Sequence, residues 1–185
     1  WRRVMTESVV VCTWQGLRED PPEERDAVLT LARRVAGDLA AELVWLIVGE
    51  PPEGSLAAAG TQGVARIDAV RGDDLGDARP DALVDAVARY CGEREVAVLL
   101  FNQNFGSRAI APRVAQRLGG GVVMNAIDVD VVDDRLDVTA SAYGGDTRVV
   151  YELDRSSPAV LALLPNVIEA ETPGGGTTDP SVTEI

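Results

Sequence analysis

Residues that could bind a ligand are concentrated in one short loop. The segment Asn102–Arg108 (NQNFGSR) carries three amides, one hydroxyl and one guanidinium. It follows the apolar run Val96–Phe101 and precedes a segment in which Ile110, Val114 and Leu118 recur every four residues. This pattern predicts a buried parallel strand, a loop at the carboxyl edge of a sheet, and an amphipathic helix. Open α/β sheets bind ligands beyond that edge, so we expect the site there.

The loop supports two kinds of chemistry. Gly106, Ser107 and Arg108 could hold a phosphate or the edge of a flavin, because backbone donors and a guanidinium would converge at the helix start. The competing interpretation, which we favour, is a capped helix with an exposed arginine, since the chain contains no GxGxxG or P-loop fingerprint. Ser107 is expected to be the cap, and Pro112 is expected near the helix start.

Other polar groups have simpler interpretations. The amides of Asn102, Gln103 and Asn104 either bind a ligand or partner, or satisfy the loop backbone, and both alternatives stay open. The sequence Tyr143-Gly144-Gly145-Asp146 predicts a hairpin turn. Two sets of aspartates are expected to be solvated rather than to bind a metal. They are Asp128, Asp130, Asp133, Asp134 and Asp137, and Asp68, Asp73, Asp74 and Asp77.

Independent catalysis is not predicted. The chain has no histidine, so no serine or cysteine has the usual general base, and no carboxylate pair is singled out by spacing. Cys12 and Cys91 have no metal-type spacing and are interpreted as buried or half-buried thiols of a reducing cytosol. Trp14, Gln15 and Trp45 could flank a crevice or an interface, but Trp45 lies within an apolar run and is expected in the core.

Charge and hydropathy exclude several classes of partner. The 185 residues include 17 basic and 30 acidic side chains, a net charge of −13. Nucleic acid and anionic membranes would be repelled by such a surface. No run approaches the roughly 18 apolar residues of a membrane span, and the first residues lack a signal-peptide core. We therefore expect a cytoplasmic protein without direct membrane insertion.

The order of the elements predicts an α/β fold with a mostly parallel, doubly wound sheet. Strands at 8–13, 42–48, 64–70 and 96–101 alternate with helices at 23–39, 56–60, 81–91 and 109–118. An antiparallel extension is expected from short pieces at 122–127, 129–132, 136–143, 147–153 and 159–164. Residues 1–7 are set aside as a disordered or extraneous start, 8–168 form one domain, and 169–185 are expected to be a flexible glycine-rich linker or tail.

Several ordered motifs resemble the amino-terminal domain of the electron transfer flavoprotein alpha subunit. They are FGSRAIAPRVAQRL after a strand, AYGGDT between two strands, AVLALLPN as the closing strand, and the glycine-rich linker behind it. The resemblance covers about Glu7 to Glu171. Three positions depart from the family pattern, because Ala109 follows Ser107-Arg108 where an acid is usual, Asp146 replaces an asparagine, and Leu164-Pro165 replaces an arginine-proline.

The resemblance implies a three-layer, Rossmann-like fold of the adenine nucleotide alpha hydrolase type. It implies a non-catalytic scaffold and subunit interface that pairs with a beta-like subunit. FAD would be held mainly by a flavin-binding domain or chain outside this one, and the redox partner would be a dehydrogenase or quinone oxidoreductase. Asn102, Gln103, Gly106, Ser107 and Arg108 become the candidate cofactor-binding residues, and Tyr143–Asp146 the candidate interface.

Two alternatives remain. A stand-alone module or sensor of the same fold would bind AMP or ATP in the crevice at Asn102–Arg108. A purely structural interaction protein would have kept the fold and lost both ligands.

Overall fold

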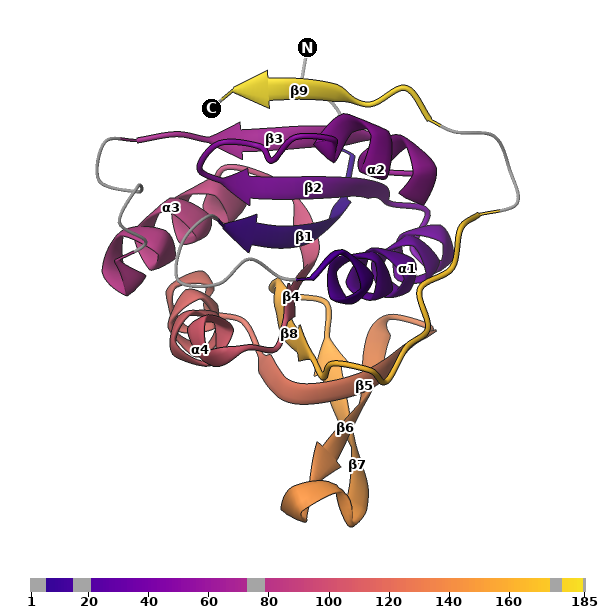
Figure 1. The fold of residues 1–185 in the computed structure, drawn as a ribbon. Coiled ribbons are helices and arrows are strands. Elements are labelled where there is room, and N and C mark those ends of the chain that lie inside the picture. Colours follow the sequence, from indigo (N-terminus) through magenta and orange to yellow (C-terminus); the bar gives the residue numbers. More distant parts are fainter. Residues whose placement is uncertain (1–5, 15–20, 73–78, 174–177, 185) are drawn as a thin grey trace.

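A nine-stranded sheet forms the centre of the computed structural model, which describes residues 6–14, 21–72, 79–173 and 178–184 (Figure 1). The helices are α1 (Pro22–Asp38), α2 (Ser55–Gln62), α3 (Pro80–Gly92), α4 (Phe105–Leu118) and the short 3-10 turn η1 (Tyr143–Gly145). The strands are β1 (Ser8–Trp14), β2 (Glu42–Val48), β3 (Arg66–Val70), β4 (Val96–Asn102), β5 (Val122–Val132), β6 (Arg135–Ala142), β7 (Thr147–Asp154), β8 (Ala159–Leu163) and β9 (Ser181–Glu184).

The strand order, β7-β6-β5-β8-β4-β1-β2-β3-β9, confirms a mostly parallel sheet with an antiparallel part. β4 lies between β8 and β1 and pairs with both in parallel, as the apolar run Val96–Phe101 predicts. The antiparallel part consists of β5, β6 and β7. Because β4 is central, its carboxyl end opens into the middle of the sheet edge rather than its margin.

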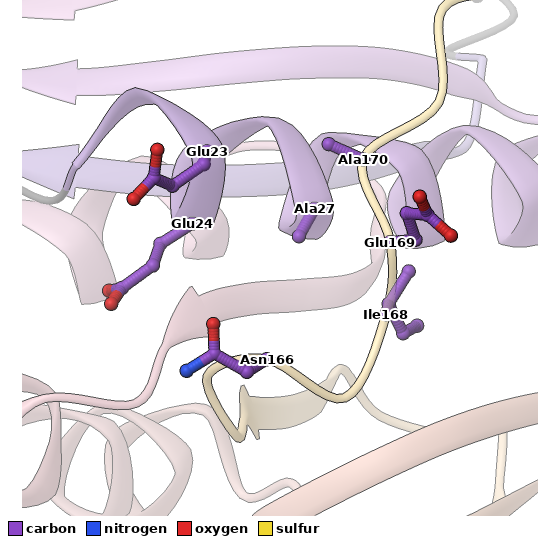
Figure 2. Close-up of a pocket in the computed structure, with 7 residues that line it drawn as sticks. All are labelled: Glu23, Glu24, Ala27, Asn166, Ile168, Glu169 and Ala170. Atoms are coloured by element: carbon purple, nitrogen blue, oxygen red, sulfur yellow. The ribbon is translucent and has the colours of Figure 1, made fainter.

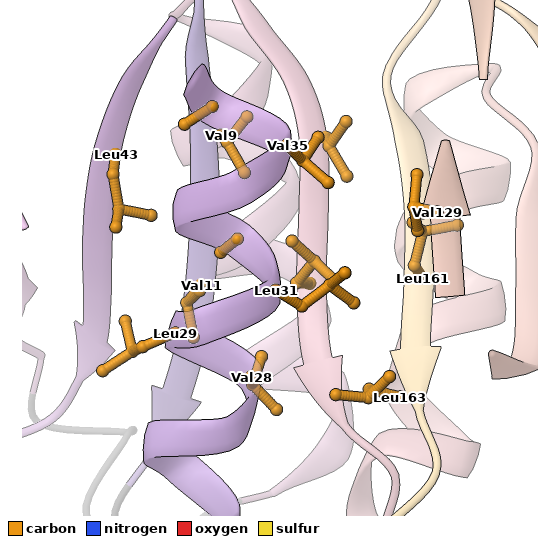
Figure 3. Packing of buried hydrophobic residues seen from close by; sticks show 14 of the residues in the cluster. Val9, Val11, Val28, Leu29, Leu31, Val35, Leu43, Val129, Leu161 and Leu163 are labelled. Carbon is orange, nitrogen blue, oxygen red and sulfur yellow. The ribbon is translucent and has the colours of Figure 1, made fainter. Parts of the chain in front are cut away.

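Helices cover both faces of the parallel strands, which gives the three layers. Alternate residues of β1 enter two separate cores, since successive side chains of a strand point to opposite faces. Val9 and Val11 pack with α1, whereas Val10 and Cys12 pack with α3 and α4. On the first face, apolar residues of α1 lie against β1, β2 and β4, and the same core continues to Leu161 and Leu163 of β8 (Figure 3). Cys12 and Cys91 are both buried, and Trp45 is a core residue, as predicted.

β8 is the principal correction to the predicted sheet. The segment AVLAL was expected in the antiparallel extension, but it pairs in parallel with both β4 and β5. All five of its residues are buried. A run without polar residues is typical of a strand covered on both faces, and here that signal outweighs the shortness of the segment. The two pieces expected at 122–127 and 129–132 form one strand, β5, with an irregular register between Ala126 and Asp128.

The carboxyl-terminal segment contains a strand that the sequence analysis did not predict. β9 extends the sheet by pairing in parallel with β3, within the region that was expected to be a linker or tail. Its four residues are all exposed, so no alternation of apolar and polar residues marks it. The division of the chain into a domain at 8–168 and a tail stays a prediction.

Asp68 is a second correction, because it was grouped with solvated acidic residues. Its residue surface is 1% exposed, and the Tyr90 hydroxyl donates to its Oδ2 at 2.5 Å. Arg66 Nε donates to the same carboxylate at 3.1 Å, and Arg94 Nε lies 4.0 Å away. Burial without such partners would be costly for a charge, so this cluster ties β3 to α3. Asp73, Asp74 and Asp77 lie outside the described residues.

The described helices include none that is long and apolar enough to cross a lipid bilayer.

Gly120 is expected to be intolerant of any side chain. A Cβ atom built there would lie 2.0 Å from the carbonyl oxygen of Pro158, which is backbone and cannot swing aside. Gly120→Ala should therefore lower the free energy of unfolding by about 2–3 kcal/mol in urea titrations. Gly92→Ala is the matched control, because nothing lies within 4 Å of its Cβ position, and it should change stability by less than about 0.5 kcal/mol. Equal losses in both variants would contradict the packing argument.

Alkaline pH is expected to destabilise the fold through Cys91. Burial raises the pKa of its thiol from 9.0 to about 12. Above pH 9 the unfolded chain loses this proton while the folded chain keeps it, so stability falls as pH rises, by up to about 1.4 kcal/mol per pH unit. Burial and the Asp68 hydrogen bond also raise the pKa of Tyr90, which adds to the decline above pH 10.

Urea titrations in reducing buffer between pH 8.5 and 10 measure this slope before the tyrosine contributes. Cys91→Ala should flatten the pH dependence in that window, whatever its effect on absolute stability. An unchanged slope would show that the thiol is not the titrating group.

Candidate functional site

The switch point of the sheet lies between β1 and β4. From β1 the chain proceeds to β2 and β3 on one side, and from β4 it proceeds to β5 on the other. The crevice beyond the carboxyl ends of two such strands is where ligands bind in open α/β sheets. β1 ends at Trp14 and β4 at Asn102, so the predicted loop lies at this crevice. Gln15 falls outside the described residues.

Asn102 and Gln103 are buried, and both amides are bonded within the chain. Asn102 Nδ2 donates to Glu24 Oε2 of α1 at 2.6 Å. Gln103 makes a double contact with Asn125 of β5: its Nε2 donates to Asn125 Oδ1 at 2.6 Å, and its Oε1 accepts from the Asn125 backbone N–H at 2.5 Å. In the structure these two amides link the end of β4 to α1 and β5, and the binding of a ligand or partner by this loop stays a prediction.

Asn125 takes part in this arrangement through an unusual backbone conformation. Its φ is +56°, in the left-handed region that asparagine tolerates better than most residues. The turn of the backbone presents both the side chain and the N–H of Asn125 to Gln103. Glu24 and Asn125 were missed by the sequence analysis, and an asparagine inside the apolar run of β5 was the only local signal.

The start of α4 differs from the prediction. Asn104 is the N-cap, and Ser107 occupies the third helical position. Asn104 Oδ1 accepts from the Ser107 N–H at 2.9 Å, and Ser107 Oγ accepts from the Asn104 N–H at 2.9 Å. This capping box satisfies two backbone donors at once, which explains why the helix starts earlier than a Ser107 cap would allow. Pro112 consequently lies inside the helix rather than near its start.

Gly106 is required by a close approach of Trp14. A Cβ at residue 106 would lie 2.8 Å from Cζ2 of the indole. Trp14 in turn packs edge-on against Phe101, with ring centroids 6.0 Å apart. The glycine thus admits a ring from the neighbouring strand, a role that does not depend on a phosphate. Arg108 and Phe105 lie on the surface of the first helical turn, and Phe105 is 89% exposed.

A cleft of about 390 Å³ adjoins the crevice on the side of α1 (Figure 2). Its walls are the first half of α1 and the segment that follows β8. The lining residues are Glu23, Glu24, Ala27, Asn166, Ile168, Glu169 and Ala170. Three carboxylates make this cleft unfavourable for a phosphate. No sequence pattern could have found it, because its walls come from segments about 140 residues apart.

The sequence Tyr143-Gly144-Gly145-Asp146 forms a hairpin turn, as predicted. The three residues of η1 join β6 to β7, and Ala142 pairs with Thr147 across the turn. Backbone φ angles of +49° at Tyr143, +71° at Gly144 and +107° at Gly145 explain the two glycines. The turn between β6 and β7 lies at the tip of the projecting hairpin (Figure 1), and its first residue, Tyr143, is 84% exposed.

The crevice and the hairpin turn do not form one site. β8 and β5 lie between β4 and β6, which separates the two by roughly 15 Å at about 4.8 Å per strand. β6 also runs opposite to β5, so its last residues point away from the carboxyl edge of the parallel strands. Any partner contacting both regions would have to span this part of the surface.

Asp128 of β5 and Asp137 of β6 are each paired with an arginine. Arg34 forms an ion pair with Asp128, and Arg135 Nε lies 2.8 Å from Asp137 Oδ1. The hydrogen bond from Arg135 holds the pKa of Asp137 below its usual value. Over the ranges that the structure describes, no group of three or more histidine, cysteine or acidic residues is arranged to hold a metal ion.

Comparisons with known proteins give a consistent result. A family model described as an electron transfer flavoprotein domain matches residues 20–184. Protein FixB of Clostridium saccharobutylicum is 31% identical over 141 residues, which cover 74% of this chain and 41% of FixB. Electron transfer flavoprotein subunit alpha of Clostridium acetobutylicum is 24% identical over 144 residues, 77% of this chain and 43% of the relative. The chain therefore spans less than half the length of these curated relatives.

Asn102→Asp tests the contact between β4 and α1. The new carboxylate would face Glu24 at the position where an amide now donates at 2.6 Å, so two like charges would meet and a hydrogen bond would be lost. We expect a loss of about 1–3 kcal/mol in the free energy of unfolding at pH 7. The double variant Asn102→Asp with Glu24→Gln restores a donor opposite the carboxylate and should recover most of the loss. Equal instability of the single and double variants would contradict the contact.

Proposed function

The chain belongs to the electron transfer flavoprotein family as an alpha-type amino-terminal domain, and we propose that it is a non-catalytic scaffold in a flavin-dependent electron-transfer complex. In this proposal it pairs with a beta-like subunit. FAD is held mainly by a flavin-binding domain of the same polypeptide or of another chain. The observation that carries the proposal is the match to less than half of FixB and of an alpha subunit, because the remaining part of such relatives has room for a separate domain.

The internal bonding of the crevice supports a scaffold. Asn102, Gln103 and Ser107 direct their polar side chains to Glu24, Asn125 and Asn104 rather than to an open pocket. A cofactor contact that displaced one of these part-buried hydrogen bonds would cost about 1–3 kcal/mol. Gly106 and Arg108 remain the parts of the predicted set that a flavin-binding domain could approach without such a loss.

We propose the hairpin turn Tyr143–Asp146 as the contact with the beta-like subunit. Tyr143 is 84% exposed on the turn, and a tyrosine side chain offers a large apolar surface while losing little conformational freedom on binding, because it has only two χ angles. Phe105 at the start of α4 has the same character and lies beside the crevice. We assign it to the contact with the flavin-binding domain, since the two aromatic residues lie in separate regions of the surface.

Co-expression with a beta-like subunit and the flavin-binding part tests the proposal. The expected product is a yellow complex that contains FAD, and Tyr143→Ala should weaken association by about tenfold or more, measured by titration calorimetry. Tyr151→Ala is the matched control, because this tyrosine is also exposed, on β7 of the same hairpin, but away from the turn. Its affinity should stay within about twofold of the unchanged chain.

Two results would contradict this function. A colourless preparation without any beta-like subunit would remove the electron-transfer role. Tight binding of ATP or AMP by the chain alone, measured by the same calorimetry, would favour a nucleotide-binding module with the same fold.

A further inference from the structure

The outer edge of β3 carries a strand that comes from the far end of the chain. Residues 178–184, here called the C-terminal strap, reach this edge after the chain leaves β8 and passes over α1 (Figure 1). Arg66, Ile67, Asp68 and Ala69 of β3 pair with the four residues of β9. Upstream of the strap the chain is attached at Glu171, whose N–H donates to Thr30 Oγ1 of α1 at 3.0 Å and whose carbonyl accepts from Arg33 at 3.2 Å.

Thr178 and Gly60 fit together at the start of the strap. The Thr178 N–H donates to the Gly60 carbonyl at 3.1 Å, and its hydroxyl donates to the Val64 carbonyl at 2.9 Å. Gly60 lies inside α2 and has no positive φ that would require a glycine. A Cβ at this position would lie 2.8 Å from the Thr178 carbonyl oxygen. The missing side chain therefore forms a notch in α2 that admits the backbone of the strap.

Polar contacts rather than apolar burial hold the strap. All four residues of β9 are exposed, and Val182, its only large apolar residue, is 40% exposed. The ion pair between Glu184 and Arg71 is exposed on both sides, so solvent screens it. Ile67 and Ala69 of β3 are buried. The side chains of a strand point to the two faces of the sheet and not toward the neighbouring strand, which here is β9. Removal of the strap would uncover a sheet edge and leave both cores closed.

We propose that residues 178–184 are a detachable strand whose acceptor surface is the β3 edge with the Gly60 notch, and that they dissociate while the rest of the domain stays folded. The strap then acts as a tether with two positions, one docked on the β3 edge and one released from it. When it is docked, Glu184 is fixed beside Ala69. When it is released, Glu184 leaves Ala69, and the last described attachment before the strap is that of Glu171 to α1. The tether requires neither FAD nor a partner subunit.

Amide hydrogen exchange on the full 185-residue chain tests this tether. In the unchanged chain, the amides of 182–184 should exchange about 100-fold or more faster than those of β1 and β4, because local opening needs less free energy than global unfolding. Gly60→Ala should raise exchange at 182–184 by a further factor of about ten, since its methyl group displaces Thr178. Gly37→Ala, a helical glycine with nothing within 4 Å of its Cβ position, is the matched control and should leave these rates unchanged.

Thr178→Val provides a second, independent variant because it removes the hydroxyl while keeping the shape. It should raise exchange at 182–184 by about threefold or more and leave α2, β1 and β4 unaffected. The tether is overturned if 182–184 exchange at the rate of β1 and β4 in the unchanged chain, or if neither variant alters that rate. It is also overturned if Gly60→Ala unfolds the domain, because strap and domain would then form one cooperative unit.

Discussion

The burial of both faces of β1, β4 and β8 is the constraint on which the other features depend. Their apolar side chains alternate between two cores, and no strand that is closed in this way can offer a polar side chain to a ligand along its length. Polar groups can appear only where the strands end. The loop after β4 therefore carries the amides, the capping box and the exposed arginine. It lies at a crevice because β1 and β4 are the parallel neighbours from which the strand order runs to opposite sides of the sheet.

Most polar side chains at this crevice form hydrogen bonds within the domain itself. Asn102 ties β4 to α1, Gln103 ties it to β5, and Asn104 with Ser107 begins α4. Gly106 makes room for Trp14 from β1. These contacts join five elements, β1, β4, β5, α1 and α4, which makes the crevice a rigid corner. A rigid corner suits a domain that supports a cofactor held by another domain, whereas an independent nucleotide site needs donors that are open to the ligand.

The two margins of the sheet are more exposed than its central strands. The β6–β7 hairpin projects from the body and presents Tyr143 on a turn fixed by two glycines, and β9 is attached to the opposite margin by backbone hydrogen bonds (Figure 1). Leu136, Val138 and Ala140 anchor β6 in the first core, whereas all four residues of β9 are exposed. β9 can therefore change position without disturbing the buried strands, because it buries little apolar surface.

The sequence by itself determined the central elements, because residues buried on both faces of a strand or on one face of a helix leave a periodic apolar pattern. β2, β4 and the stripe of α4 are of this kind, and so is the hairpin turn, whose glycines follow from local backbone conformation. The tertiary structure alone decided the rest. The parallel place of β8, the burial of Asp68 beneath Tyr90, the bond of Asn102 to Glu24 and the addition of β9 all depend on residues far apart in the chain, and hydrogen bonds between distant residues leave no periodic trace in a single sequence.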